Sequence, residues 1–392
     1  MTETIETLLP GETLGLLGGG QLGRMFAQAA AQMGYHVLVL EPSNPSPAGE
    51  VSCAQIAAAY DDTTALDEMS RAVRAVTTEF ENVPATSLEH LARLGVRTAP
   101  HADAVAVTQD RNREKAFAES AGVPTAPHAG ICAESDWENV TEDLFPGILK
   151  TARLGYDGKG QVRVDSKADA RKAWEALDRT DCILEKRLNL AKEISVIVCR
   201  NQAGSRAVFP VAENHHRNGI LAYTVLPARI SPEIAKMAQR YAERIVDAFG
   251  YVGVLCLEFF VLEDGAIVLN EMAPRPHNSG HATIEACVSS QYDQQVRAMT
   301  GLPLGSTALK TPAVMLNLLG DLWFDEAGHY RTPDWAALCS IPGLKLHLYG
   351  KEQARHARKM GHATVVGQTL EEALERAKAA AEMLSLPFAG EL

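Results

Sequence analysis

The segment Gly18-Gly-Gly-Gln-Leu-Gly23 stands directly between an apolar run and an amphipathic helical pattern. The apolar run is Leu14–Leu17, the helical pattern covers Leu22–Gln32, and a second strand-like run follows at Tyr35–Leu40. A strand, a tight glycine turn, a helix and a second strand make a βαβ unit, which requires a parallel sheet covered by helices. This feature therefore predicts a Rossmann-like domain at the start of the chain.

The same turn fits the dinucleotide pattern G-x-G-x-x-G, and Glu41 stands at the end of the second strand-like run. The N-terminus of a helix offers unpaired N–H groups to any anion, so a phosphate, a ribose or a carboxylate could occupy the turn. A purely structural turn is also compatible with the pattern. An NAD-dependent oxidoreductase is thus one hypothesis that these residues leave open.

The length of 392 residues is sufficient for two or three packed domains. Thirty glycines and an aromatic content of only 6% favour α/β layers with many tight turns over a β-sandwich. Patterns along the chain predict a Rossmann-like domain over residues 1–108, a hairpin-rich central domain over 109–305 and a small C-terminal domain over 306–392. The predicted fold class is α/β and α+β.

Charge and apolar patterning exclude several classes of protein. The chain has 37 basic and 49 acidic side chains, a net charge of −12, and no basic stripe, so we expect no nucleic-acid partner. No apolar run approaches the roughly 18 residues of a membrane span. Met1–Thr13 lacks the basic and apolar regions of a signal peptide, and the seven scattered cysteines indicate reduced core thiols. We therefore expect a cytoplasmic protein with no membrane partner.

Further elements follow from local patterns. A helix is expected at Ser87–Leu94, another at Gln109–Gly122, and a C-terminal one at Leu370–Leu384. Strands are expected at Ala75–Thr78, around Val96, and at Ile148–Lys150, Gln161–Val164, Cys182–Lys186, Ile194–Cys199, Val252–Val261 and Ala266–Asn270.

Two carboxylates form the most informative pair in the sequence. Asp264-Gly265 lies between two apolar runs and is a strong signal for a two-residue hairpin loop. If Glu263 faces Ala266 across that loop, then Glu258 faces Glu271. Opposed residues on antiparallel strands have Cβ atoms about 4.5–5.5 Å apart, and like charges there are destabilising.

Such a pair needs compensation. Either one carboxylate has a raised pKa, or divalent cations lie between the two, and oxygen ligands of this kind suit Mg²⁺. The alternative is a solvent-facing sheet edge on which the two side chains splay apart. Asn270, beside Glu271, is a further candidate oxygen ligand or phosphate contact.

The sequence contains no G-x-x-x-x-G-K-[ST] motif, which excludes a P-loop ATPase. Instead, Lys150 ends an apolar strand and is followed by the glycine-rich segment Leu154–Gln161. A loop of this composition can fold over phosphates, with its N–H groups and Lys159 facing their charge. An ordinary hairpin tip is the alternative.

Together these motifs resemble the ATP-grasp superfamily and, within it, the N5-carboxyaminoimidazole ribonucleotide synthetase family. The resemblance covers residues 14 to about 366. It is based on Gly18–Gly23, Glu79-Phe-Glu81-Asn82, Tyr156–Gln161, Glu213-Asn-His-His216, Asn270–His281 and Lys359-Met-Gly-His362. It implies an ATP-grasp central domain with a mobile lid at about residues 125–190.

The resemblance implies a role for each matched position. Glu258 and Glu271 would hold Mg²⁺. ATP would contact Arg111, Lys150, Gly155, Tyr156, Asp157, Gly158, Gly160, Gln161, Glu185, Lys186, Arg187, Leu188, Glu193, His216, Asn270 and Glu271. The ribonucleotide would contact Gly20, Gln21, Leu22, Glu79, Tyr156, Asp157, Arg275, Lys351 and Arg358. The catalytic group would comprise Arg275, His277, Asn278 and Lys159.

Two positions depart from the family pattern or are ambiguous. Lys159 stands where the family often has Arg, and the doublet His215-His216 leaves open which imidazole lies at the nucleotide. His277 and His281 are four residues apart, but Pro274, Pro276 and Gly280 interrupt any helix through them, so a substrate loop is favoured over a zinc site.

The implied activity is the ATP-dependent carboxylation of 5-aminoimidazole ribonucleotide by bicarbonate, with ADP and phosphate as by-products, in purine synthesis. The cofactors would be ATP and Mg²⁺, without NAD, zinc or biotin, and the family implies a homodimer. The rival hypotheses are an ATP-grasp ligase that uses formate or another acyl donor, the NAD-dependent oxidoreductase, and a nucleotide sensor that binds ATP without splitting it.

Overall fold

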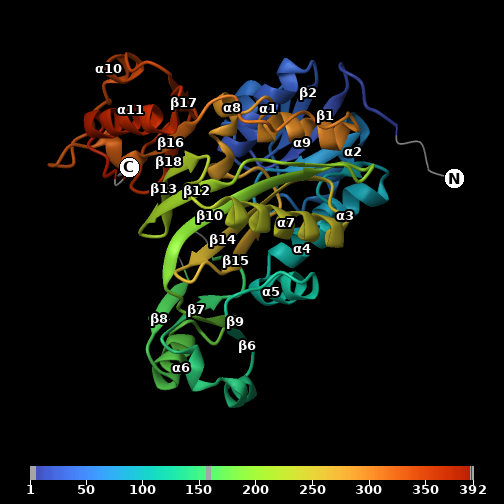
Figure 1. Ribbon diagram of the computed structural model, residues 1–392. Coiled ribbons are helices and arrows are strands. Elements are labelled where there is room, and N and C mark those ends of the chain that lie inside the picture. Colours follow the sequence, from blue (N-terminus) through green and yellow to red (C-terminus); the bar gives the residue numbers. More distant parts are fainter. Residues whose placement is uncertain (1–5, 156–159, 389, 391–392) are drawn as a thin grey trace.

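The computed structural model describes residues 6–155, 160–388 and 390 of the chain, and these residues form three β-sheets with helices packed against them (Figure 1). An N-terminal parallel sheet and a long central antiparallel sheet lie close together. The third, four-stranded sheet projects away from them with helix α6, at the lower end of the view in Figure 1. The predicted combination of an α/β unit with α+β units is confirmed.

The N-terminal sheet is entirely parallel, in the order β3-β2-β1-β4-β5. Its order reverses at β1, as in doubly wound folds. Its strands are β1 (Thr13–Leu17), β2 (His36–Leu40), β3 (Ala54–Ile56), β4 (Ala75–Thr78) and β5 (Arg97–Thr98). Its helices are α1 (Gln21–Gln32), α2 (Thr63–Ala72), α3 (Ala85–Arg93) and α4 (Ala102–Thr108).

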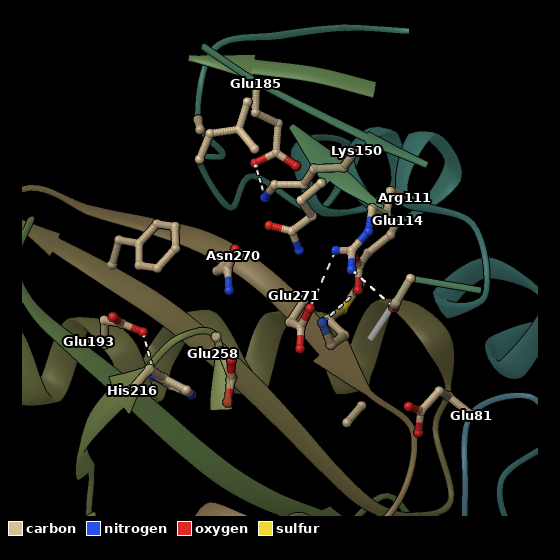
Figure 2. A pocket seen from close by; sticks show the side chains of 18 of the residues that line it. Glu81, Arg111, Glu114, Lys150, Glu185, Glu193, His216, Glu258, Asn270 and Glu271 are labelled. Carbon is tan, nitrogen blue, oxygen red and sulfur yellow. Dashed lines mark hydrogen bonds and ion pairs between the residues drawn. The ribbon is translucent and has the colours of Figure 1, made fainter. Parts of the chain in front are cut away.

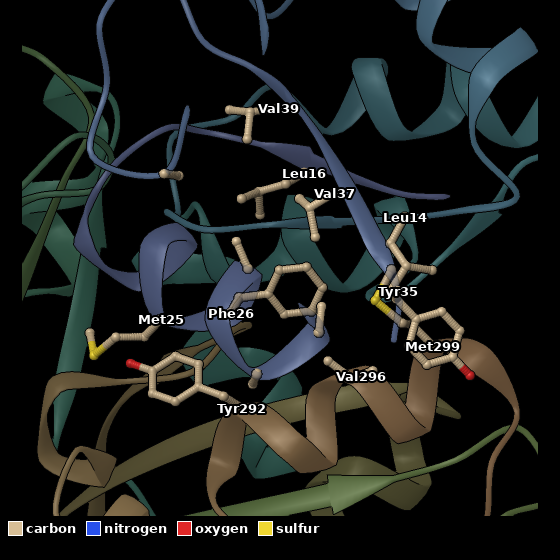
Figure 3. Close-up of a cluster of buried hydrophobic side chains, with 14 of the residues drawn as sticks. Leu14, Leu16, Met25, Phe26, Tyr35, Val37, Val39, Tyr292, Val296 and Met299 are labelled. Atoms are coloured by element: carbon tan, nitrogen blue, oxygen red, sulfur yellow. The ribbon is translucent and has the colours of Figure 1, made fainter. Parts of the chain in front are cut away.

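Alternate residues of these strands bury opposite faces of the sheet. Leu14 and Leu16 face α1, whereas Leu17 faces the core formed with α2 and α3. The α1 face is completed by α9 (Gln291–Thr300), whose Tyr292 and its neighbours contact the same cluster (Figure 3). A helix that lies in sequence between strands β15 and β16 of the central sheet therefore packs against both α1 and β14, and holds the N-terminal unit against that sheet.

The central sheet has the order β15-β14-β10-β12-β13-β16-β18-β17, with β11 paired to β10. Its strands are β10 (Leu190–Arg200), β11 (Arg206–Val208), β12 (Ala212–Arg217), β13 (Ile220–Leu226), β14 (Gly253–Leu262), β15 (Ile267–Ala273), β16 (Ala313–Leu319), β17 (Leu344–Leu348) and β18 (Lys359–Val366). Because β13 pairs with β16, hydrogen bonding continues across the predicted domain boundary at 305/306.

The projecting sheet has the order β6-β9-β7-β8 and packs against α6 around Trp137 and Trp174. Its strands are β6 (His128–Ile131), β7 (Gly147–Thr151), β8 (Gln161–Val164) and β9 (Cys182–Lys186). The remaining helices are α5 (Arg111–Ser120), α6 (Lys167–Ala176), α7 (Pro232–Phe249), α8 (Thr283–Ala286), α10 (Trp335–Cys339) and α11 (Leu370–Met383). Short 3-10 helices are η1 (Gly49–Val51), η2 (Glu134–Asn139), η3 (Glu142–Leu144), η4 (Asn278–Gly280) and η5 (Gly320–Trp323).

Two sequence expectations need correction. The single helix expected at Gln109–Gly122 begins later, at Arg111, because the Asp110 side chain caps it by accepting the N–H groups of Asn112 and Arg113. The cysteines are not all core thiols, since Cys53, Cys132 and Cys339 are exposed. None of the helices within the described residues combines the length and apolar character of a transmembrane span.

Candidate active site

A cleft of about 840 Å³ is lined by residues of the projecting sheet, the β14–β15 hairpin and the start of α5 (Figure 2). Acidic side chains enter it from all three elements, and basic ones from the projecting sheet and α5. The predicted site residues that line it are Arg111, Lys150, Gly155, Gln161, Glu185, Lys186, Arg187, Leu188, Glu193, His216, Glu258, Asn270, Glu271, Arg275, His277 and Asn278. Positions that are distant in the sequence are thus brought together here.

The loop of the β14–β15 hairpin is one residue longer than predicted. The last pair of the ladder joins Val261 to Ile267, so the expected pairing of Glu263 with Ala266 is wrong. Gly265 has a φ of +84°, the left-handed conformation found in three-residue hairpin loops. The sequence pattern identified the turn but not its length.

The predicted pairing of Glu258 with Glu271 is nevertheless correct. The ladder shifts by one residue between Glu258 and Phe259, since Phe259 pairs with Leu269 and Asn270 is passed over. Asn270 is therefore the additional residue of a β-bulge. The bulge compensates for the longer loop and directs Asn270 and Glu271 towards the cleft (Figure 2).

The pKa of Glu258 is raised, as the sequence predicts for one member of a closely opposed carboxylate pair. Burial and the neighbouring Glu271 raise the pKa of Glu258 to about 7, although His216 opposes the rise. The Nε2 atom of His277 lies 3.6 Å from Oε1 of Glu258. Burial, together with the positive charge of Arg275, lowers the pKa of His277 well below its usual value. The site thus favours a neutral imidazole beside a carboxyl group that binds a proton readily.

The His215-His216 doublet is divided between two environments. The ring of His215 stacks on Tyr223 and bonds to the carboxylate of Glu213 at 2.9 Å, outside the cleft. His216 lines the cleft and lies 2.6 Å from Glu193. Burial opposes protonation of His216, but the bond to Glu193 and nearby carboxylates raise its pKa to about 9. A register shift between the two histidines separates them.

Basic groups face these carboxylates. Nη1 of Arg111 lies 3.3 Å from Oε2 of Glu271, and Nζ of Lys150 lies 3.1 Å from Oε2 of Glu185. Burial lowers the pKa of Lys150, against the opposing effect of Glu185. Burial acts to raise the pKa of Glu185, but the positive charges of Lys115 and Lys150 outweigh this effect and lower the pKa to about 2. Glu185 is therefore ionised, and its side chain orients Lys150.

Two carboxylates occupy the glycine-rich turn at the start of α1. Glu41 accepts the N–H of Gly19 at 2.9 Å, and Glu79 accepts the N–H groups of Gly20 at 2.9 Å and Gly23 at 3.3 Å. The donors that a dinucleotide fold offers to a pyrophosphate are thus engaged by the protein's own side chains. This arrangement argues against the oxidoreductase hypothesis.

A smaller pocket of about 310 Å³, the side pocket, lies beside η1 and is lined by Lys351 and Arg358, among others. Nζ of Lys351 donates to Oε1 of Gln21 at 2.8 Å and to the carbonyl of Lys359 at 2.7 Å. Leu22 is buried in the core of the N-terminal unit, so its side chain is not available to a ligand. Of the predicted substrate residues, Lys351 and Arg358 therefore line this second location, and Gln21 contacts Lys351.

Sequence reasoning left out several cleft residues. Glu81 forms a charge-assisted hydrogen bond to Nε of Arg275 at 2.8 Å, and Lys359 also lines the cleft. Both stand inside the quoted motifs, which could have identified them. Glu114, which lines the cleft, and Lys115, which lies behind it, had no sequence signal. The predicted residues Tyr156, Asp157, Gly158 and Lys159 lie outside the described residues. The carbonyl oxygen of Gly160, at their border, accepts a hydrogen bond from the N–H of Thr151 at 2.9 Å.

Glu258, Glu271 and Asn270 provide oxygen donors suited to a hard cation. Within the described residues, no three His, Cys, Asp or Glu side chains are grouped so as to hold a metal by themselves. His277 bonds to Ser279, and His281 bonds to the Tyr292 hydroxyl, so the two histidines serve separate contacts. The arrangement suits a cation that receives its other ligands from phosphates.

Known proteins resemble the chain over nearly its full length. An N5-carboxyaminoimidazole ribonucleotide synthase of Brucella melitensis is 46% identical over 91% of this chain and 97% of its own. The chain belongs to the N5-carboxyaminoimidazole ribonucleotide synthase family. A second relative of the same name, from Bacillus subtilis, is 39% identical over 94% of each chain.

Family models and solved structures agree with this membership. The ribonucleotide synthetase preATP-grasp domain matches residues 11–109, the ATP-grasp domain 116–292, and the phosphoribosylaminoimidazole carboxylase C-terminal domain 313–376. The ADP complex of an N5-carboxyaminoimidazole ribonucleotide synthetase superposes with a TM-score of 0.90 at 41% identity, covering 97% of this chain and 99% of that one. An Aspergillus clavatus synthase in complex with ADP and 5-aminoimidazole ribonucleotide gives 0.84 at 33% identity, covering 95% and 98%. The projecting sheet thus belongs to an ATP-grasp domain.

Proposed function

We propose that the chain is a carbon–nitrogen ligase that carboxylates 5-aminoimidazole ribonucleotide at the expense of ATP, in purine synthesis. The observation that carries the proposal is the composition of the cleft. The paired carboxylates of its β14–β15 hairpin lie in the same cleft as Arg111 and Lys150, and the cleft also includes Arg275 and His277. Relatives of the same family are known in complex with ADP and with the ribonucleotide. Membership of that family supports the same substrates here.

ATP would lie between the projecting sheet and the β14–β15 hairpin. Its phosphates would contact Arg111 and Lys150, whose charges face the cleft. Oε1 of Glu185 is buried without a hydrogen-bond partner among the described residues, and it is suited to accept a hydrogen bond from the amino group of adenine. Glu193 and His216 would lie at the ribose. The proposed domain limits remain 1–108, 109–305 and 306–392, with a lid at about 125–190.

Magnesium would be held by Glu258 and Glu271 together with nucleotide phosphates. The observation that supports this is the pairing of two carboxylates in a buried hairpin, which raises the pKa of Glu258 to about 7 in the absence of a cation. When bound, the ion would neutralise the charge that develops on the phosphates.

The reaction we propose has two steps. A bicarbonate oxygen attacks the γ-phosphorus of ATP, the bond to the β-phosphate oxygen breaks, and carboxyphosphate and ADP result. The exocyclic amine of the ribonucleotide then attacks the carboxyl carbon, phosphate leaves, and the amine proton passes to a base, giving the carbamate. Arg275 would stabilise the negative charge, while His277 and Asn278 would orient the reactants.

The ribonucleotide would extend from Arg275 past Glu79 and Gly20 to the side pocket. Lys351 and Arg358 would bind its 5′-phosphate there, because they supply two positive charges next to the start of α1. A cytoplasmic homodimer is the assembly we expect.

The experiment that tests this function is release of ADP from Mg-ATP, with and without the ribonucleotide and with and without added bicarbonate. We expect release that requires both. Equal release with formate in place of bicarbonate would indicate a different acyl donor, and ATP binding without release would indicate a sensor. A change in nicotinamide absorbance would revive the oxidoreductase hypothesis.

A further inference from the structure

Lys115 is a fully buried lysine that sits behind the cleft and does not line it. Its Nζ donates to the carbonyl oxygens of Leu269 at 3.1 Å and Asn270 at 2.7 Å. The same ammonium lies 3.6 Å from Oε2 of Glu185. A buried charge is costly unless it is paired and hydrogen-bonded, so these three contacts explain how the fold tolerates it.

The two carbonyls belong to the bulge that carries Asn270 into the cleft. A bulge disrupts the ladder, so its backbone groups need partners from outside the sheet. Lys115 supplies a donor on one side of Glu271. The neighbouring residue of α5, Glu114, accepts the N–H of Met272 on the other side at 2.5 Å. Two consecutive side chains of α5 therefore hold the backbone on both sides of Glu271.

Lys115 also connects the two walls of the cleft. Its partner Glu185 belongs to β9 of the projecting sheet and bonds to Lys150, whereas its carbonyl partners belong to β15. One ammonium group thus contacts the wall that carries Lys150 and the wall that carries Glu271. Loss of that group would release both at once.

We propose that Lys115 is a positioning residue which fixes the Asn270–Glu271 bulge and thereby sets the affinity of the site for magnesium nucleotide. The proposal rests on the proposed function, because it assumes that Glu271 serves such a ligand. Lys115 touches no substrate. It acts through the backbone of the bulge and through Glu185.

The test is a calorimetric titration of the full chain with ADP, at several Mg²⁺ concentrations and in EDTA. The variant Lys115→Met keeps a side chain of similar length but removes its charge. In this variant we expect Mg-ADP binding to weaken about tenfold or more, as is usual when a group that supports a metal ligand is lost. Binding of ADP in EDTA should weaken by less, because the contact with Glu185 is lost in both conditions whereas the position of Glu271 matters only when Mg²⁺ is present. The matched control is Lys167→Met, since Lys167 also donates to a carbonyl, that of Val140, away from the cleft.

The outcomes are distinguishable. Unchanged Mg-ADP binding in Lys115→Met, or an equal loss with and without Mg²⁺, would overturn the proposal. If that variant does not fold, Lys115→Arg takes its place, because it keeps the charge beside Glu185. The planar guanidinium cannot place a single ammonium between the two carbonyls, so we again expect a loss of ADP affinity that is larger with Mg²⁺ than without it. Mg-ADP binding equal to that of the parent chain would overturn the proposal. A parent chain that binds no ADP would instead refute the proposed function.

Discussion

Glu258 and Glu271 face each other across the β14–β15 hairpin, and this pairing exists only because a bulge at Asn270 offsets a loop that is one residue longer than the two-residue turn. Without the bulge, Glu271 would point to the opposite face of the sheet, because side chains alternate along a strand. The carboxylate pair therefore depends on one extra residue in β15.

Replacement of Glu271 by Gln should lower turnover by roughly a thousandfold while the fold remains intact. The reason is that one of the two carboxylates proposed to hold Mg²⁺ is lost, and with it the ion that would neutralise the charge on the phosphates. ADP release and thermal melting would measure the two effects. Glu263→Gln is the matched control, since Glu263 is exposed in the loop of the same hairpin. Retained activity in Glu271→Gln would contradict the metal assignment.

The pair of His216 and Glu193 should make stability depend on pH. The pKa of His216 rises from 6.5 to about 9 in the folded chain, so the stabilisation is complete below pH 6.5 and is lost as the pH rises through 9. After allowance for the partial exposure of Glu193, we expect on the order of 2 kcal/mol.

The measurement is the difference in melting temperature between the parent chain and Glu193→Gln from pH 6 to pH 10, without nucleotide. The difference should be largest at the acidic end and small at the alkaline end. His215→Asn serves as a control, since His215 contacts Glu213 outside the cleft. A difference that does not vary with pH would show that the ion pair does not cause it.

Lys351→Ala should raise the KM for the ribonucleotide by about tenfold or more and leave the KM for ATP nearly unchanged, because a charge-assisted contact to a phosphate is worth about 1.5–3 kcal/mol. Steady-state kinetics with each substrate varied in turn would show the separation. Lys345→Ala, an exposed lysine on β17, should leave both values as they are. A rise in the KM for ATP would place Lys351 at the nucleotide instead.

Gly20→Ala should lower stability by about 1–3 kcal/mol and weaken ribonucleotide binding, since its Cβ would lie 2.5 Å from Oε1 of Glu79. Denaturant unfolding would measure the loss. The double variant Gly20→Ala/Glu79→Ala removes the clash and should be less destabilised than the sum of the single variants. Additive losses would indicate that Glu79 and Gly20 act independently.

Local patterns in the sequence were sufficient for most of the strands. The βαβ unit at Leu14–Leu40 and the strands at Ala75–Thr78, Gln161–Val164 and Cys182–Lys186 are where the patterns predicted them, because strand alternation and glycine turns are short-range signals. The predicted length of the hairpin loop at Gly265 was wrong by one residue. Loop length and bulges depend on how the finished ladder packs, which a single strand pattern does not specify.

The sequence by itself determined the βαβ unit at the start of the chain, the presence of the carboxylate pair and, through the quoted motifs, the family. Only the tertiary structure decided how those residues meet: that His216 rather than His215 enters the cleft, that Glu79 closes the glycine turn, and that Lys115 supports the bulge. The physical reason is that hydrogen bonds and ion pairs join residues far apart in the sequence, such as Lys115 and Asn270, which are 155 positions apart, and no local pattern encodes such a contact.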